Sequence, residues 1–317
     1  MAGIRLEFAQ FGDFDSFDII RSNTSMSGLA DVDLPDPIIT GLTTMYYVDT
    51  SIVLGSTYYY KVRVNRDAES VVSAEIEVVA ELGDKYWSNV VSLLHFDGVN
   101  GSTDFIDEKG NVWVRVGSPT ISTEQSAFGG ASGRFTSGNY IKTGMSPAFD
   151  LGTGDFTLEA LIYIPQGATF MDDEIPIIVA GQQNIGGSGQ GWDFVLFDRS
   201  PPKLRIESAL LGTAPYCMFD LPESLPRNTF LSIAISRVAG VCYGFYKGLL
   251  LGTSTGLNGV QLSNPNNHAV LIGSGSSGAG SENYYHTNGY YDEIRITKGY
   301  GRYTSSYTPA SGKFPHG

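Results

Sequence analysis

The stretch "NGYYDEIRITKGYGRYTSSYTP", residues 288–309, decides the fold that the sequence predicts. Its apolar residues alternate with polar ones, which is the pattern of a β-strand with one buried face. Asp292 and Glu293 are adjacent here, and adjacent side chains of a strand point to opposite faces. The pair therefore cannot act together on one substrate. The alternation places Asp292 on the apolar face with Ile294 and Ile296, where a carboxylate needs a partner.

Other segments predict strands in the same way. The segment 56–67 alternates, and so does the segment 156–164, while 229–257 predicts three strands with turns at "VAG" and "YKG". The 39 glycines and the 12% aromatic content suit short strands joined by tight turns, and no 12-residue window has a helical period. The sequence therefore predicts an all-β protein. The expected buried faces are Tyr58, Tyr60, Val62 and Val64 in the first segment and Phe156, Leu158, Ala160 and Ile162 in the second.

The net charge restricts the possible binding partners, and its uneven distribution indicates a domain boundary. The 33 acidic and 20 basic residues give a net charge of −13, which argues against nucleic acid as a partner. The longest apolar runs are too short to cross a bilayer, so no membrane span is expected. Residues 1–83 hold 13 acidic and 5 basic residues, a net charge of −8, whereas residues 84–317 have a net charge of −5. This asymmetry predicts a domain boundary near residues 80–89.

The first part resembles a known family of small sandwiches. Residues 41–79, "GLTTMYYVDTSIVLGSTYYYKVRVNRDAESVVSAEIEVV", resemble the C-terminal half of a fibronectin type III domain, and Tyr58 resembles the corner tyrosine of that family. The resemblance implies an immunoglobulin-like, fibronectin III-like sandwich over residues 1–83. Such domains are spacers or docking modules, so an anchoring role is expected.

The second part carries four motifs in a familiar order, at residues 86–113, 126–143, 149–165 and 290–309. Together they resemble the concanavalin A-like, laminin-G-like jelly roll of phage and prophage virion proteins. The resemblance implies a jelly-roll sandwich over residues 84–317. This fold supports lectins, glycoside hydrolases and structural modules, so it does not fix a function.

The resemblance also suggests calcium. Asp97, in "LLHFDGVNG", follows an apolar strand and precedes a turn. If the first and last strands of the second part pair, Asp97 and Asp292 lie near one rim, and members of this fold often hold such an ion. Calcium takes six to eight oxygen ligands, which loop carbonyls would complete. The alternative is that Asp292 bonds only to backbone amides or to an arginine.

Catalytic carboxylates are not evident. Glucanases of related fold use carboxylates at alternate positions of one strand, so that acid and nucleophile share a face. No such stretch occurs in this sequence. Asp172 and Glu174, in "MDDEIP", share a side, but this segment suggests a solvated loop. We therefore expect no enzyme.

Two glycine- and serine-rich segments, 181–194 and 273–291, carry aromatic residues and are expected to be loops. Sugar rings stack on aromatic planes, and carboxylate or amide groups bond to hydroxyls. The alternative is that Trp192 is a core residue and the loops are merely long. The candidate glycan-binding residues are Trp192, Glu282, Asn283, Tyr284, Tyr285 and His286.

These observations lead to one hypothesis with two alternatives. The chain is expected to be a non-enzymatic component of a phage virion, a tail fibre or tail-tip protein that is assembled in the host cytoplasm. Its first domain would contact other virion proteins, and its second would bind host surface polysaccharide. The alternatives are a structural or decoration protein of tail or capsid without a ligand, and a polysaccharide depolymerase. No coiled-coil heptad is present, and homo-oligomerisation stays open.

Overall fold

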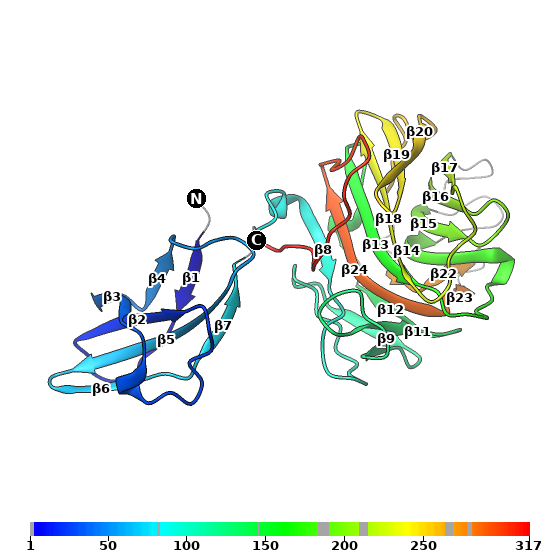
Figure 1. Ribbon diagram of the computed structural model, residues 1–317. Coiled ribbons are helices and arrows are strands. Elements are labelled where there is room, and N and C mark those ends of the chain that lie inside the picture. The colour runs from blue at the N-terminus through cyan, green and yellow to red at the C-terminus, as the bar shows by residue number, and fades with distance from the viewer. Residues whose placement is uncertain are drawn as a thin grey trace. The chain divides into compact units, whose positions relative to one another are not determined.

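The computed structural model describes residues 3–80, 83–144, 146–182, 190–208, 215–263, 269–277 and 281–317, with the backbone alone at 182, 190, 276–277 and 281–285. The chain divides into two compact units, Met1–Asp84 and Lys85–Gly317 (Figure 1). Apart from short 3₁₀ turns, all described regular structure is β-strand, so the predicted all-β class is confirmed. No helix in these described ranges is long and apolar enough to cross a membrane.

The N-terminal unit consists of two antiparallel sheets. A two-stranded sheet joins β1 to β4, and a second sheet has the order β3-β2-β5-β6, with β7 pairing with the first half of β5. A small apolar core lies between them and includes Ile19 and Tyr60. The elements of this unit are β1 (Ile4–Glu7), β2 (Ser16–Ser22), η1 (Asp31–Asp33), β3 (Pro37–Leu42), β4 (Tyr46–Asp49), β5 (Thr57–Arg66), β6 (Glu69–Val72) and β7 (Ile76–Val79).

Strand β5 has the alternation that its sequence predicts. Tyr58 and Tyr60 are buried on the core side, whereas Val62 and Val64 on the same face are only half-buried. The Tyr58 hydroxyl accepts a hydrogen bond of 2.8 Å from the backbone N–H of Val53. A corner tyrosine makes a bond of this kind to the backbone a few residues upstream. Assignment of the unit to the fibronectin type III family stays a prediction.

The C-terminal unit is a sandwich of two larger antiparallel sheets. Its elements are η2 (Trp87–Asn89), β8 (Val90–Leu94), β9 (Trp113–Val116), β10 (Thr120–Ser122), β11 (Ser132–Phe135), β12 (Tyr140–Thr143), η3 (Pro147–Phe149), β13 (Phe156–Tyr163), η4 (Met171–Asp173), β14 (Glu174–Gln182), β15 (Gln190–Phe197), β16 (Lys203–Ser208), β17 (Tyr216–Asp220), β18 (Phe230–Val238), β19 (Val241–Tyr246), β20 (Leu249–Ser254), β21 (Val270–Ile272), β22 (Ser274–Ser277), β23 (Ser281–His286) and β24 (Gly289–Lys298).

One sheet has the order β10-β11-β24-β13-β18-β19-β20, with β8 also paired to β24. The other has the order β17-β16-β15-β14-β21-β12-β9. The main hydrophobic core includes the predicted face of β13, which is Phe156, Leu158, Ala160 and Ile162. The predicted three-stranded meander is β18-β19-β20, and its turns have positive φ at Ala239–Gly240 and Lys247–Gly248, as two-residue type I′ turns require.

Strand β24 pairs with β8, which is the condition of the calcium hypothesis for the first and last strands, but it is not a regular strand. Its register with β13 shifts between Asp292 and Arg295, and Glu293 has a φ of 50°. Such an extra residue is a β-bulge, and it reverses the alternation that follows it. Tyr291 and Ile294 therefore both reach the core. The expectation that Asp292 shares the face of Ile294 is wrong, because that expectation assumed an unbroken strand.

A fully buried arginine near the end of β18 holds two loops by hydrogen bonds. The Arg237 side chain is 0% exposed, and its guanidinium donates to four backbone carbonyls. The acceptors are Gly154 at 2.8 Å, Gly152 at 2.7 Å, Val260 at 3.1 Å and Leu257 at 3.4 Å. A guanidinium offers five donors in a fixed plane, so it can satisfy several loop carbonyls at once.

We predict that Arg237→Met destabilises the C-terminal unit, because it leaves these buried carbonyls without donors. The free energy of unfolding in urea should fall by about 3 kcal/mol. The control is Arg134→Met, since the Arg134 side chain is 48% exposed. A loss in Arg237→Met no larger than in the control would contradict this account of the loops.

Candidate functional site

Strands β14 to β17 carry charged side chains on the side of their sheet opposite the main core, beside the buried apolar residues Val195 and Phe197. Along β15 and β16, alternate residues such as Phe194 and Ile206 belong to the core. Asp193 and Glu207 lie directly opposite each other in the register, one position before Phe194 and one after Ile206. They therefore point away from the core. We call the side of β14–β17 on which they lie the outer face.

On the outer face, one arginine gathers three carboxylates. Arg205 Nη2 lies 2.9 Å from Asp193 Oδ2 and 3.9 Å from Glu174 Oε1, and Arg205 Nη1 lies 2.9 Å from Glu207 Oε2. The Asp193 side chain is fully buried, whereas 13% of Arg205, 14% of Glu174 and 23% of Glu207 remain exposed. We call Glu174, Asp193, Arg205 and Glu207 the carboxylate–arginine cluster. It is anchored inside the protein but accessible from solvent.

The surroundings raise the pKa of two of these carboxyl groups, so that both are partly protonated at neutral pH. Burial raises the pKa of Glu174 to about 7; Arg205 opposes this rise, and the neighbouring carboxylates add to it. Burial and then the charge of Asp193 raise the pKa of Glu207 to about 7. Two carboxyls with these values supply protonated and ionised forms together at neutral pH.

An exposed aromatic ring borders the cluster. Tyr216, the first residue of β17, is 53% exposed and lies directly opposite Glu207 in the register. Directly opposed side chains in an antiparallel pair are within contact distance of each other. A flat aromatic ring therefore adjoins carboxylates, which can accept hydrogen bonds, and a guanidinium, which can donate them.

The candidate calcium ligands belong to the other sheet of this unit, Asp292 within β24 and Asp97 just after β8. Asp292 is fully buried, and its Oδ2 accepts from the backbone N–H of Ala127 at 2.9 Å and of Phe128 at 3.2 Å. The other oxygen, Oδ1, is buried with no hydrogen-bond partner. Burial raises the pKa of Asp292 to about 8, and repulsion from Glu293 and Asp97 adds to that rise.

Asp97 contacts the same loop as Asp292. A Cβ on Gly129 would overlap Asp97 Oδ1, so this oxygen lies against the backbone of residues 126–130. It too is buried without a hydrogen-bond partner, while Oδ2 lies 3.2 Å from Lys313 Nζ. Within the described residues, no three acidic, histidine or cysteine side chains gather as metal ligands. Two orphaned carboxylate oxygens beside a loop fit a calcium ion that backbone carbonyls would complete.

The glycan-binding residues expected from sequence are placed differently. Trp192 is 0% exposed and donates from Nε1 to the carbonyl of Phe149 at 3.0 Å, so it cannot stack on a sugar. It belongs to β15, which faces the core at that position. His286 is half-buried, its Nδ1 has no partner, and burial lowers its pKa.

The segment 273–291 is not the loop that we expected. It contains the hairpin β22–β23 and the start of β24. Glu282, Asn283, Tyr284 and Tyr285 belong to β23, but their side chains lie outside the described residues. Their part in glycan binding stays a prediction.

The carboxylate–arginine cluster was missed in the sequence. The segment 171–176 suggested a solvated loop, but Glu174 begins β14 and its side chain is largely buried. The other acidic members lie on two further strands, and only the cross-strand register brings the three together. The available signal was the alternation in "KLRIES", 203–208, where Arg205 and Glu207 share one face.

Comparisons with known proteins give structural likenesses only. No family model matches the chain, and no curated protein matches it. One similar structure is domain 4 of AbnA, a GH43 extracellular arabinanase from Geobacillus stearothermophilus, in complex with arabinotriose. It is 13% identical with a TM-score of 0.47, over 67% of this chain and 93% of that one.

Two further likenesses are weaker. A Trypanosoma rangeli sialidase is 13% identical with a TM-score of 0.43, over 76% of this chain and 40% of the sialidase. The enzymatically active domain of tailspike protein 2 from bacteriophage CBA120 is 16% identical with a TM-score of 0.40. That match covers 63% of this chain and 29% of the tailspike chain.

The expectation that this chain is not an enzyme is corrected. The similar structures include an arabinanase domain, a sialidase and the active domain of a tailspike. The single-strand motif on which that expectation rested does not cover this arrangement, because Glu174, Asp193 and Glu207 share one face of the sheet from three different strands.

We predict that the cluster makes the free energy of unfolding depend on pH. The pKa values of Glu174 and Glu207, about 7 in the folded state, exceed the unfolded value of about 4.3. The folded protein then binds more protons than the unfolded one across this window, so the free energy of unfolding falls as pH rises from about 4.5 to 7. Glu174→Gln or Glu207→Gln should make this fall shallower, by on the order of 1 kcal/mol.

Urea denaturation at several pH values across this window measures the slope. Asp220→Asn, on β17 with a side chain 63% exposed, is the control and should leave the slope unchanged. Equal slopes in the native protein and in both glutamate variants would contradict the assigned proton uptake.

Proposed function

We propose that the unit Lys85–Gly317 binds a glycan on the outer face of β14–β17. The observation that carries the proposal is the exposed Tyr216 ring, which lies in register with Glu207 beside Arg205. Sugar rings stack their C–H faces on aromatic planes, and carboxylates and guanidinium groups bond to their hydroxyls. The outer face offers both kinds of contact within one sheet.

Charge indicates the class of sugar. The cluster sets three carboxylates against one arginine, and the whole chain has a net charge of −13. Acidic sugars would be repelled from such a face, whereas neutral sugars would bond to its acceptors through their hydroxyls. The proposed ligand is therefore a neutral glycan.

The proposed setting is the tail of a phage virion, assembled in the host cytoplasm. The order of the four sequence motifs in residues 86–309 supports this setting, since it resembles the order in phage and prophage virion proteins. In this setting the N-terminal unit contacts other virion proteins, and the jelly roll binds polysaccharide on the host surface as part of a tail fibre or tail tip.

Calcium is proposed as a structural ion held by Asp97 and Asp292. The two buried, unpartnered Oδ1 atoms support this assignment. When bound, the ion would neutralise the two carboxylates. The residues themselves already join three segments, since Asp97 follows β8, Asp292 belongs to β24, and both contact the loop 126–130.

Glycoside hydrolysis is a second candidate function. It is favoured by Glu174 and Glu207, which both lie beside the guanidinium of Arg205. Each of these carboxyl groups has a pKa of about 7. A protonated carboxyl can give its proton to the leaving oxygen, and an ionised one can activate water or attack the sugar. Either glutamate can take either role near neutral pH.

Glycan binding is tested with an array of neutral and acidic oligosaccharides. We expect binding to neutral members and a loss on Tyr216→Ala of about 1 kcal/mol, roughly a fivefold lower affinity. Tyr46→Ala is the control, since Tyr46 is 46% exposed but belongs to the N-terminal unit. No binding to any neutral member, or equal binding by both variants, would exclude this site.

Release of reducing ends from the bound glycan separates hydrolysis from binding alone. Glu174→Gln and Glu207→Gln should abolish any release while binding persists. Release that survives both substitutions would place the catalytic groups elsewhere.

The calcium proposal predicts a shift in thermal stability. Calcium at about a hundred times its Kd should raise the melting temperature by about 5 °C over the chelator-treated protein, because it binds only the folded state. Asp292→Asn should remove this difference, and Asp104→Asn, at an exposed position, should keep it. A melting temperature indifferent to calcium and chelator would leave Asp97 and Asp292 without an ion.

A further inference from the structure

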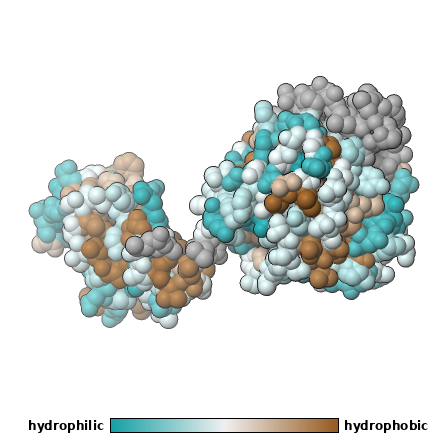
Figure 2. All heavy atoms as spheres, turned by 90° about the horizontal axis from the view of Figure 1, so that it is seen from above, coloured by the Kyte–Doolittle hydropathy of each residue, from teal (hydrophilic) through white to brown (hydrophobic). Residues whose placement is uncertain are grey.

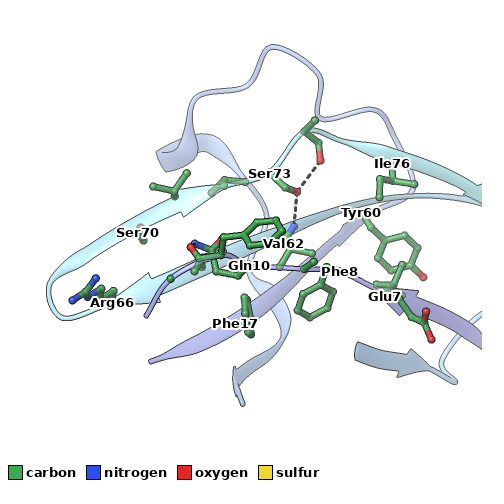
Figure 3. A pocket seen from close by; sticks show the side chains of 18 of the residues that line it. Glu7, Phe8, Gln10, Phe17, Tyr60, Val62, Arg66, Ser70, Ser73 and Ile76 are labelled. Atoms are coloured by element: carbon green, nitrogen blue, oxygen red, sulfur yellow. Dashed lines mark hydrogen bonds between the residues drawn. The ribbon is translucent and has the colours of Figure 1, made fainter. Parts of the chain in front are cut away.

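The N-terminal unit contains an open groove of about 850 Å³ (Figure 3). Its floor is strand β5, which contributes every second residue from Tyr60 on, namely Tyr60, Val62, Val64 and Arg66. Residues at this spacing belong to one face of a strand. Tyr60 is buried, whereas Val62 and Val64 are half-buried and line the groove. The sandwich is therefore covered along only part of its length.

The walls of the groove are strand edges. Residues 5–8 line it consecutively from one side, and residues 69–74 line it consecutively from the other. Side chains of a strand alternate between faces, so an unbroken run of lining residues indicates that the backbone edge faces the groove. Strand β1 pairs only with β4, and β6 and β7 pair only with β5, among the strands of the described ranges. Two strand edges thus border one groove with hydrogen-bonding groups to offer.

Apolar side chains at the groove are exposed. Phe11 is 96% exposed, Val71 is 71% exposed and Ile76 is 54% exposed. Figure 3 shows Phe8, Phe17 and Val62 gathered between the two edges, and Figure 2 shows apolar residues in brown over the surface of this unit. Exposed apolar patches beside free strand edges are typical of sites where another segment binds.

We propose that this groove accepts an extended strand from a different polypeptide, with apolar residues at alternate positions and lysine or arginine at the others. An extended backbone can bond to the edges of β1 and β6, while its apolar side chains cover Val62 and Val64. The basic residues follow from charge, because residues 1–83 have a net charge of −8. The same charge opposes a second copy of this chain as the occupant. The proposal is independent of glycan binding by the other unit.

The test uses the full chain and a fluorescent synthetic peptide, Lys-Val-Thr-Val-Lys-Val-Thr-Val-Lys, in an anisotropy titration. We expect saturable binding that weakens at least about tenfold when alternate amides are N-methylated, because strand addition depends on main-chain donors. A peptide with glutamate in place of lysine should also bind more weakly. Val71→Lys and Ile76→Lys should each reduce affinity at least about tenfold.

Val32→Lys is the matched control, since Val32 is 91% exposed and does not line the groove. Thermal unfolding of each variant establishes that it is folded. No binding at millimolar peptide, or equal binding of the N-methylated peptide, would overturn the proposal. Sedimentation of the full chain tests the other occupant: a dimer that Ile76→Lys dissociates would mean that a second copy fills the groove.

Discussion

Strand β24 pairs with three other strands, and the packing of the C-terminal unit depends on how it accommodates all of them. It pairs with β8, β11 and β13, and it carries adjacent acidic residues into a buried sheet. The bulge at Glu293 resolves the conflict. Asp292 turns to the backbone amides of one loop, while Glu293 bonds to His95 Nδ1 at 2.8 Å and accepts from Phe314 N–H at 2.7 Å. Each carboxylate finds a partner because the strand is irregular.

Much of this fold could be predicted because apolar alternation reports which side of a strand is buried. The face of β13 and the meander β18–β20 followed from that signal. The pairing of β8 with β24 was a condition of the calcium hypothesis. The bulge was not predicted, because the residues after Asp292 alternate regularly and an inserted residue shows only in which face each of them reaches. Trp192 was misplaced for a related reason: a glycine-rich neighbourhood suggested a loop, whereas β15 extends to Gln190 and buries the ring.

The two candidate sites differ in how much of each could be predicted from the sequence. Asp97 and Asp292 could be proposed together because both adjoin terminal strands, and they do contact one loop. The carboxylate–arginine cluster could not, because its members come from three strands whose register only the folded sheet defines. Its glutamates are raised in pKa by burial, a property that follows from the tertiary environment of a residue and not from its neighbours in sequence.

Among the described residues, the edges of β1 and β6 at the groove pair with no further strand, and this has a consequence for the behaviour of the chain in solution. An apolar groove between unpaired strand edges would promote edge-to-edge aggregation, and here the net charge of −8 on residues 1–83 opposes it. That repulsion is electrostatic and acts over a Debye length of only about 8 Å at physiological ionic strength. Salt concentration therefore governs colloidal stability. Copies of the chain that stay dispersed at low ionic strength lose their mutual repulsion at high ionic strength, where the same strand edges can associate.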